Sequence, residues 1–152
     1  MMSYVSIKEA SERLGIAAET IRLYERKGLI ITERTDGGQR RFDESDIERL
    51  RCIRKAINAH KISIEGIRRI QGLVPCWKYK RCPPDRRETC PSYRRAEAGC
   101  WTAQHTNDPC AKEQCRSCTV YRRSGNCETI RLLIHSNQTP SAHPHKNEGN
   151  DL

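Results

Sequence analysis

Nine cysteines are the residues of this chain best suited to chemistry, and eight of them fall within one segment. Thiolates bind soft metal ions strongly, and two cysteines separated by two residues can reach the same ion. Cys115 and Cys118 have this separation, and Cys110 precedes them at the spacing that begins a plant-type iron–sulfur loop. The predicted metal ligands are Cys76, Cys82, Cys90, Cys100, Cys110, Cys115, Cys118 and Cys127.

The segment that holds these cysteines has almost no aliphatic side chains, because Val120 is the only Val, Leu or Ile between residues 75 and 127. Such a segment cannot bury enough apolar area to offset its chain entropy, so metal–thiolate bonds are expected to order it. The predicted cofactor is an iron–sulfur cluster or zinc. A disulfide switch and the capture of heavy metals remain open. The aromatic residues Trp77, Tyr79, Tyr93, Trp101 and Tyr121 could form a shell around the centre.

Helical patterns precede the cysteines. Ser6 and Glu9 form a capping box, and a first helix is expected over residues 7–14, ending at Gly15. A second helix is expected from about residue 18 to 27, with Gly28 after it. It is basic, and the net charge of +9 indicates an anionic partner such as nucleic acid. A short basic helix after a glycine turn is typical of a helix-turn-helix recognition helix, whose candidate DNA-binding residues are Thr20, Arg22, Tyr24 and Lys27.

A β-hairpin is expected after the second helix. Residues 29–32 and 39–42 read as strands around the turn Asp36-Gly37-Gly38. Alternation along the second strand places Arg40 and Phe42 on one face and Arg41 on the other. Phe42 should anchor this wing, while Arg40 and Arg41 are candidate DNA contacts.

Two more helices complete the first half of the chain. Asp43 should cap one helix that reaches about Ala59, and Ser63 should cap another that ends before Pro75. Cys52 lies in the third helix, away from the other cysteines, and is expected to be a small core or boundary residue.

Residues 4–73 resemble the DNA-binding domain of MerR-type transcriptional regulators. The matching motifs are residues 7–10, 21–29, 37–42 and 46–50, in that order. The resemblance implies a winged helix-turn-helix that acts as a homodimer on inverted-repeat operators in double-stranded DNA and controls RNA polymerase at the promoter. Ala17 stands where the family usually has a capping Ser or Thr. No heptad pattern for a long dimerisation helix follows residue 74.

The layout around Cys76-Trp77 and Cys100-Trp101 is similar to a bacterial module with two Cys-Trp dipeptides, which implies a sensory or binding role. The expected fold is therefore mainly α, with a winged helix-turn-helix over residues 1–74 and a small irregular metal-binding domain over 75–127. A short apolar helix over 128–135 and a disordered tail over 136–152 should follow.

The expected function is sequence-specific DNA binding in transcription, controlled by the metal or iron–sulfur centre. A cytoplasmic protein is expected because no long apolar run forms a signal peptide or a membrane span. No motif of an enzyme is present. The alternatives are a DNA-binding protein with purely structural zinc and a redox or electron-transfer protein.

Overall fold

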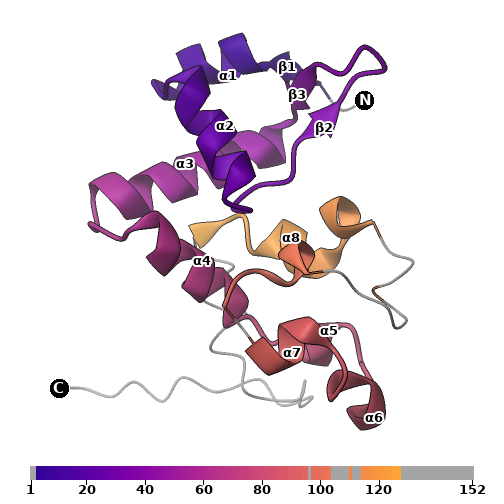
Figure 1. Ribbon diagram of the computed structural model, residues 1–152. Helices are drawn as coiled ribbons and strands as arrows, with labels where there is room; N and C mark the ends of the chain where they lie inside the picture. The colour runs from indigo at the N-terminus through magenta and orange to yellow at the C-terminus, as the bar shows by residue number, and fades with distance from the viewer. Residues whose placement is uncertain (1–2, 96, 104–109, 111–113, 128–152) are drawn as a thin grey trace, which may run out of the picture.

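The computed structural model describes residues 3–95, 97–103, 110 and 114–127, and these form a mainly helical protein with one small sheet (Figure 1). The first half of the chain contains α1 (Ile7–Leu14), α2 (Ala18–Arg26), α3 (Glu44–Asn58) and α4 (Ile64–Gly72). The sheet contains β1 (Val5–Ser6), β2 (Glu33–Arg34) and β3 (Arg40–Phe42).

Local signals in the sequence explain the helix boundaries. The Ser6 hydroxyl accepts a hydrogen bond from the Glu9 amide, and Gly15 ends α1 in the left-handed conformation (φ 63°). Asp43 and Asp46 form a reciprocal capping box at the start of α3. Ser63 caps α4 through the Gly66 amide. No side-chain bond caps α2, because Ala17 has no acceptor.

The wing differs from the prediction in its first strand. Residues 29–32 form no strand, and β2 lies at Glu33–Arg34. Leu29 and Ile30 are apolar because they fill the core, not because they pair in a ladder. The sheet also gains β1, so that the order is β1-β3-β2 with both pairs antiparallel. Val5 pairs with Phe42, and Glu33 pairs with Arg41.

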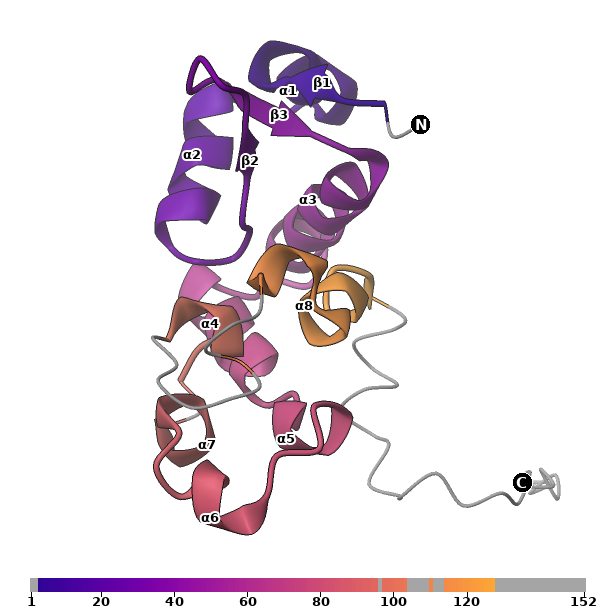
Figure 2. The ribbon, with the colours of Figure 1, turned by 90° about the vertical axis from the view of Figure 1, so that its right-hand side faces the viewer.

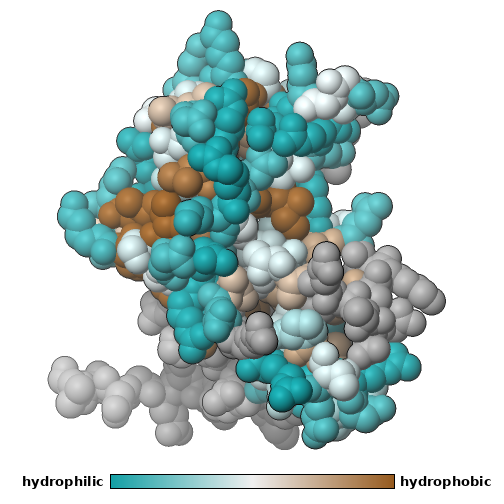
Figure 3. Space-filling model, viewed as in Figure 1, coloured by the Kyte–Doolittle hydropathy of each residue, from teal (hydrophilic) through white to brown (hydrophobic). Residues whose placement is uncertain are grey.

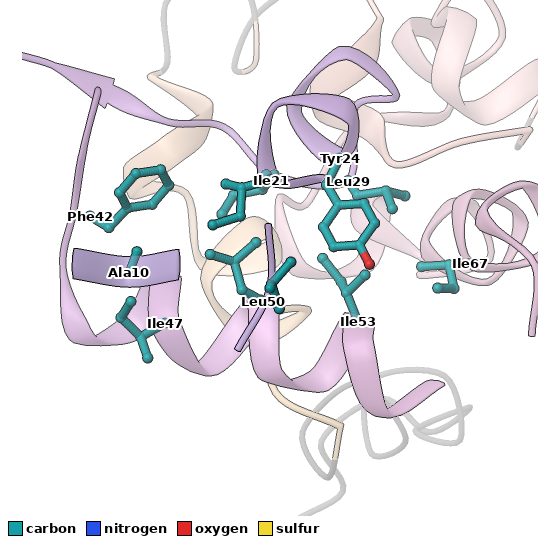
Figure 4. Packing of buried hydrophobic residues seen from close by; sticks show 11 residues of the cluster. Ala10, Ile21, Tyr24, Leu29, Phe42, Ile47, Leu50, Ile53 and Ile67 are labelled. Carbon is teal, nitrogen blue, oxygen red and sulfur yellow. The ribbon is translucent and has the colours of Figure 1, made fainter. Parts of the chain in front are cut away.

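A core of aliphatic side chains and two aromatic rings joins α1, α2, α3 and the wing (Figure 4). Phe42 is fully buried, as predicted, and anchors β3 above Ala10 and Ile47. Tyr24 points from α2 toward Ile53 of α3. The buried members of this core are Ala10, Ile16, Ile21, Tyr24, Leu29, Ile30, Phe42, Ile47, Leu50, Ile53 and Ile67.

The cysteine-rich half consists of short helical turns. These are α5 (Cys76–Tyr79), α6 (Pro84–Arg87), α7 (Pro91–Arg95), η1 (Cys100–Thr102), η3 (Cys115–Ser117) and α8 (Thr119–Arg123). Figure 2 shows α8 between α3 and the α5–α7 region. A second cluster of Val74, Cys76, Cys118, Val120 and Tyr121 forms its core, and Ile31 of the first half packs against it.

The predicted apolar helix and tail, 128–135 and 136–152, lie outside the described residues. Among the residues that are described, no helix has the length and apolar character needed to cross a membrane.

Candidate nucleic-acid interface and cysteine cluster

Basic side chains lie on the exposed face of α2 and on the wing, and hydrophilic residues cover this end of the molecule (Figure 3). Arg22 is about a third exposed and pairs with Glu19 at 3.2 Å. Lys27 is about half exposed, and its Nζ lies 3.8 Å from Glu65. Thr20 is partly exposed on the same helix. The candidate residues of α2, apart from Tyr24, are therefore accessible to a ligand.

The candidate wing arginines are also paired with carboxylates. Arg41 lies 2.8 Å from Glu33 and packs over the Tyr4 ring, so it faces away from the core. Arg40 is less exposed, and its Nε donates to Glu25 of α2 at 2.5 Å. The predicted alternation of Arg40 and Arg41 along β3 is confirmed. Arg40 links the wing to α2, whereas Arg41 lies on its outer face.

Tyr24 does not lie on this surface. Its side chain is 4% exposed and belongs to the core, and burial raises the pKa of its hydroxyl. The prediction of Tyr24 as a DNA contact is therefore wrong. Residues three positions apart lie on the same face of a helix, so Tyr24 shares the inner face of α2 with the core residue Ile21.

The cysteine-rich half docks directly on the end of α2. The Trp101 indole N–H donates to the Gly28 carbonyl at 2.7 Å. Gly28 has a positive φ of 75°, and a Cβ at this position would lie 2.6 Å from Thr102 Cγ2. Gly28 is therefore needed both to end α2 and to admit η1.

Arg116 makes several contacts between the two halves. Its guanidinium donates to Asp46 at 2.6 and 2.8 Å, to Asp43 at 3.1 Å and to the Ile31 carbonyl at 2.9 Å. The two aspartates cap α3, and Ile31 lies in the connection between α2 and the wing. Burial raises the pKa of Asp46, whereas hydrogen bonds and the charge of Arg116 hold the pKa of Asp43 below its usual range.

Tyr121 and Arg49 form a second contact between the halves. The Tyr121 hydroxyl accepts from the Ile31 amide at 2.8 Å. Arg49 of α3 is buried and donates to the carbonyls of Leu29 and Tyr121 and to the Ser124 hydroxyl. Its guanidinium also lies 3.9 Å from the Tyr121 ring centroid and 4.7 Å from that of Trp101. Nothing in the sequence distinguishes Arg49 or Arg116 from the other arginines, so sequence reasoning missed both.

Four of the predicted metal ligands line one small hollow. Cys100, Cys110, Cys115 and Cys118 surround it together with Lys80, Trp101 and Tyr121, and its volume is about 10 Å³. Cys76 adjoins the group, because the Cys100 thiol hydrogen-bonds to its sulfur and lowers the pKa of Cys76. Burial raises the pKa of Cys110 to about 12. Folding thus brings Cys76 and Cys100 beside the three thiols of residues 110–118.

The remaining predicted ligands lie outside the hollow. Cys82 does not line it, and burial raises the pKa of Cys82, with further contributions from Cys76 and Cys90. Cys127 is joined to Cys52 in a disulfide, with 5.7 Å between the Cα atoms. The predictions of Cys127 as a metal ligand and of Cys52 as a simple packing residue are therefore wrong in this structure. Folding brings the end of α8 beside α3, a proximity with no local sequence signal.

The sulfur atoms of the hollow are suitable ligands for a metal, but their present arrangement is not that of a metal site. Its donors are sulfur atoms, the ligand type that zinc and iron–sulfur clusters prefer. Among the described residues, no group of three or more Cys, His, Asp or Glu is already arranged around a metal position. A volume of about 10 Å³ admits one water-sized sphere. A single ion would need small side-chain movements, and a multi-iron cluster would need the walls to separate.

The predicted shell of aromatic residues is divided into two pairs. Trp77 and Tyr93 meet edge to face with centroids 4.9 Å apart, and Trp101 and Tyr121 do so at 5.1 Å. The second pair lies between the thiols and Arg49. Trp101 and Tyr121 therefore contact both the thiol hollow and the helix-turn-helix half.

Comparison with known proteins identifies the first half of the chain. Residues 5–72 match the family model described as "MerR HTH family regulatory protein". The putative heat shock protein HspR of Streptomyces coelicolor is 38% identical over 64 residues, which cover 42% of each chain. The HTH-type transcriptional regulator HmrR of Rhizobium leguminosarum bv. viciae is 38% identical over 69 residues, covering 45% of this chain and 53% of HmrR.

The chain thus spans about half the length of these curated relatives. No solved structure matches it. The family match ends before Cys76, so the cysteine cluster lies beyond it. Residues 5–72, with their capped helices, glycine turn and small wing, are a helix-turn-helix domain of the MerR family.

Proposed function

We propose that this protein is a transcriptional regulator that binds double-stranded DNA through α2 and the wing, and that its cysteine-rich half controls this binding through a metal or iron–sulfur centre. The MerR-family domain and its exposed basic residues support the first part. A homodimer on an inverted-repeat operator, acting on RNA polymerase at the promoter, is the arrangement that such a domain favours.

The DNA contacts in this proposal come from two elements. Arg22, Thr20 and Lys27 lie on the exposed side of α2, and Arg41 lies on the outer face of the wing. Arg40 sets the position of the wing through Glu25. In the absence of DNA, the carboxylates of Glu19 and Glu33 hold Arg22 and Arg41 in defined positions. On DNA, phosphate oxygens would replace these carboxylates.

The position of Arg116 is the single observation that carries the regulatory part. Arg116 lies between Cys115 and Cys118, which line the thiol hollow. Its guanidinium binds the carboxylates that cap α3 and the carbonyl of Ile31, which precedes the wing. A change in the spacing of the two sulfurs must therefore move Arg116 or strain its ion pairs.

A metal centre would supply bonds that hold the sulfur atoms of Cys100, Cys110, Cys115 and Cys118 together. Trp101 and Arg116 would then transmit a change in the hollow to Gly28 and Ile31, at the two ends of the connection from α2 to the wing. This connection sets the angle between the recognition helix and the wing, and hence the distortion of DNA that the protein can impose.

The test begins with protein purified without air. Iron, acid-labile sulfide and visible charge-transfer bands would identify an iron–sulfur centre, and a colourless protein with stoichiometric zinc would identify a zinc site. An operator is then selected from random DNA, and its affinity is measured for loaded, metal-depleted and oxidised protein. The proposal requires affinity, DNA bending or transcription by RNA polymerase to differ between these states. Equal values in all three would leave a DNA-binding protein with a purely structural centre.

Matched cysteine variants test whether the thiol hollow carries the response to metal removal. The double substitution Cys115→Ser and Cys118→Ser should abolish the response to metal removal, because both residues line the hollow. Cys90→Ser is the control, since Cys90 does not line it. If Cys90→Ser abolished the response and the double variant retained it, the assignment of the hollow would be wrong.

A further inference from the structure

An apolar groove lies between α3 and α4, and the residues that follow α8 form its third side. Its volume is about 220 Å³, and it shares no cysteine with the thiol hollow. Its floor is buried, whereas Ile62 and Ile70 on its walls are partly exposed. The apolar lining residues are Ile53, Ala56, Ile62, Ile67 and Ile70.

The apolar surface of the groove continues along α4. Ile70 belongs to neither of the two core clusters formed by the described residues. Leu73 follows Ile70 by three positions, which places it on the same side of the helix, and it is 49% exposed. A continuous row of exposed apolar side chains beside an apolar groove is typical of an interaction site.

The last described residues of the chain are fixed to the edge of this groove. Gly125 packs against α3, where a Cβ would lie 3.3 Å from the Arg49 Cβ. Cys127 is bonded to Cys52 of α3, and both Gly125 and Cys127 line the groove. The end of the described chain lies beside α3 in Figure 1. Residue 128 must therefore begin at the edge of the groove.

The next residues of the sequence have the pattern that an apolar groove requires. Apart from the last residue of the chain, every large apolar side chain beyond residue 127 falls within residues 130–134. At helical spacing, Ile130, Leu133 and Ile134 share one face, and Leu132 lies on the opposite face. The sequence thus offers one apolar helix face directly after the point where the chain meets the groove.

This segment also matches the groove in reach and in size. Three residues of extended chain span at most about 10 Å, so Ile130 must lie within that distance of Cys127. A helix over residues 128–135 is roughly 12 Å long, and the groove follows α3 over a similar length, from Cys52 to His60. A cavity of roughly 150 Å³ accepts benzene, so a volume of about 220 Å³ has room for more than one aliphatic side chain.

The short connection favours the segment of the same chain over that of a second copy. A segment held by a few residues is present at its site at an effective concentration on the order of 1 mM, which a separate molecule does not reach at ordinary protein concentrations. Charge favours the same arrangement, because Glu128 begins the segment and Lys55 lies in the lining of the groove.

We propose that residues 128–135 of this chain dock in the groove between α3 and α4 through Ile130, Leu133 and Ile134. The segment fastens the end of the cysteine-rich half to α4, in addition to the Cys52–Cys127 bond to α3. This contact requires neither DNA nor metal.

Photo-crosslinking in the full-length protein identifies what lies in the groove. His60 is exposed and lines the groove, so His60→p-benzoylphenylalanine places a photoreactive group on its rim. After irradiation, peptide mass spectrometry should show a crosslink to residues 130–135, in a product that has the mass of the monomer on a reducing denaturing gel. Asn58→p-benzoylphenylalanine is the control, because Asn58 is exposed near the same end of α3 but lines a different cavity.

Three outcomes of the crosslinking experiment would overturn the proposal. The first is that His60→p-benzoylphenylalanine gives no crosslink to residues 130–135. The second is that this crosslink appears only at the mass of a covalent dimer, which would assign the groove to a second copy. The third is an equal yield from the Asn58 position, which would show proximity without docking.

A matched pair of substitutions tests which face of the segment is docked. Leu133→Asp should reduce the crosslink from His60 several-fold and raise the rate of amide hydrogen exchange in α4, because α4 loses its cover. Leu132→Asp is the same change on the opposite face and should alter neither value. Equal effects of the two substitutions, in variants checked for folding by circular dichroism, would refute the assigned face. Neither experiment uses DNA or metal, so a negative result would leave the regulatory proposal intact.

Discussion

Replacement of Arg116 by leucine should destabilise the protein strongly at neutral pH and less at acidic pH. In the folded protein, the guanidinium contacts Asp46, which is 1% exposed, and Asp43, which is 5% exposed in its side chain. Arg116→Leu leaves Asp46 buried without its cation, whereas Asp43 keeps Arg122 at 3.5 Å. Breaking a buried ion pair typically costs 3–5 kcal/mol. Because the Arg116 side chain is 18% exposed, we expect a loss of about 3 kcal/mol in the free energy of unfolding.

The pH dependence follows from the pKa of Asp46. Burial already raises this pKa, and Arg116 is the main group that opposes the rise. Without Arg116 the folded-state pKa rises further above the unfolded value of about 4. A raised carboxyl pKa means that the folded state binds the proton more tightly, so the folded state loses stability as pH increases through this window. The difference in the free energy of unfolding between wild type and Arg116→Leu should therefore be smaller at pH 5 than at pH 7.5.

Urea denaturation at the two pH values, followed by circular dichroism, measures this effect. Arg94→Leu is the control, because Arg94 is exposed on α7 and the change should cost less than about 0.5 kcal/mol. A double-mutant cycle with Asp46→Asn isolates the pair. If Arg116→Leu lost no more stability than Arg94→Leu, or if its loss did not depend on pH, the docking of the cysteine-rich half on α3 would be refuted.

Three further predictions concern other parts of the molecule. Arg22→Ala should weaken operator binding by about 1–3 kcal/mol if Arg22 reads a base, or reduce the salt dependence if it contacts phosphate; Arg94→Ala, measured in the same filter-binding assay, should do neither. Tyr24→Phe should leave operator affinity unchanged, whereas Tyr24→Ala should lower the free energy of unfolding by about 3–5 kcal/mol, because Tyr24 is a core residue. The Cys52–Cys127 disulfide spans 75 residues, so its reduction should cost about 4 kcal/mol by loop-closure entropy. A double substitution of Cys52 and Cys127 by serine should show the same loss in urea denaturation and no further response to reductant.

The order and limits of the first four helices could be read from the sequence because they depend on neighbouring residues. Ser6, Asp43 and Ser63 satisfy the free amides of the turn that follows each of them, and Gly15 supplies a conformation that other residues avoid. The outward face of Arg41 and the burial of Phe42 follow in the same way from the two-residue period of a strand. These are interactions over a few positions, and the side chains that make them are visible in the sequence.

The relation between the two halves was decided only by the tertiary structure. Arg116 meets Asp46 across 70 residues, Trp101 meets Gly28 across 73, and Cys52 meets Cys127 across 75. Such contacts depend on how complete surfaces fit together, and an arginine, a tryptophan or a cysteine has the same local pattern whether it faces solvent, metal or another helix. The sequence therefore determined that a MerR-family helix-turn-helix domain is joined to a cluster of thiols. Only packing decided that the cysteine-rich half lies against the connection between α2 and the wing.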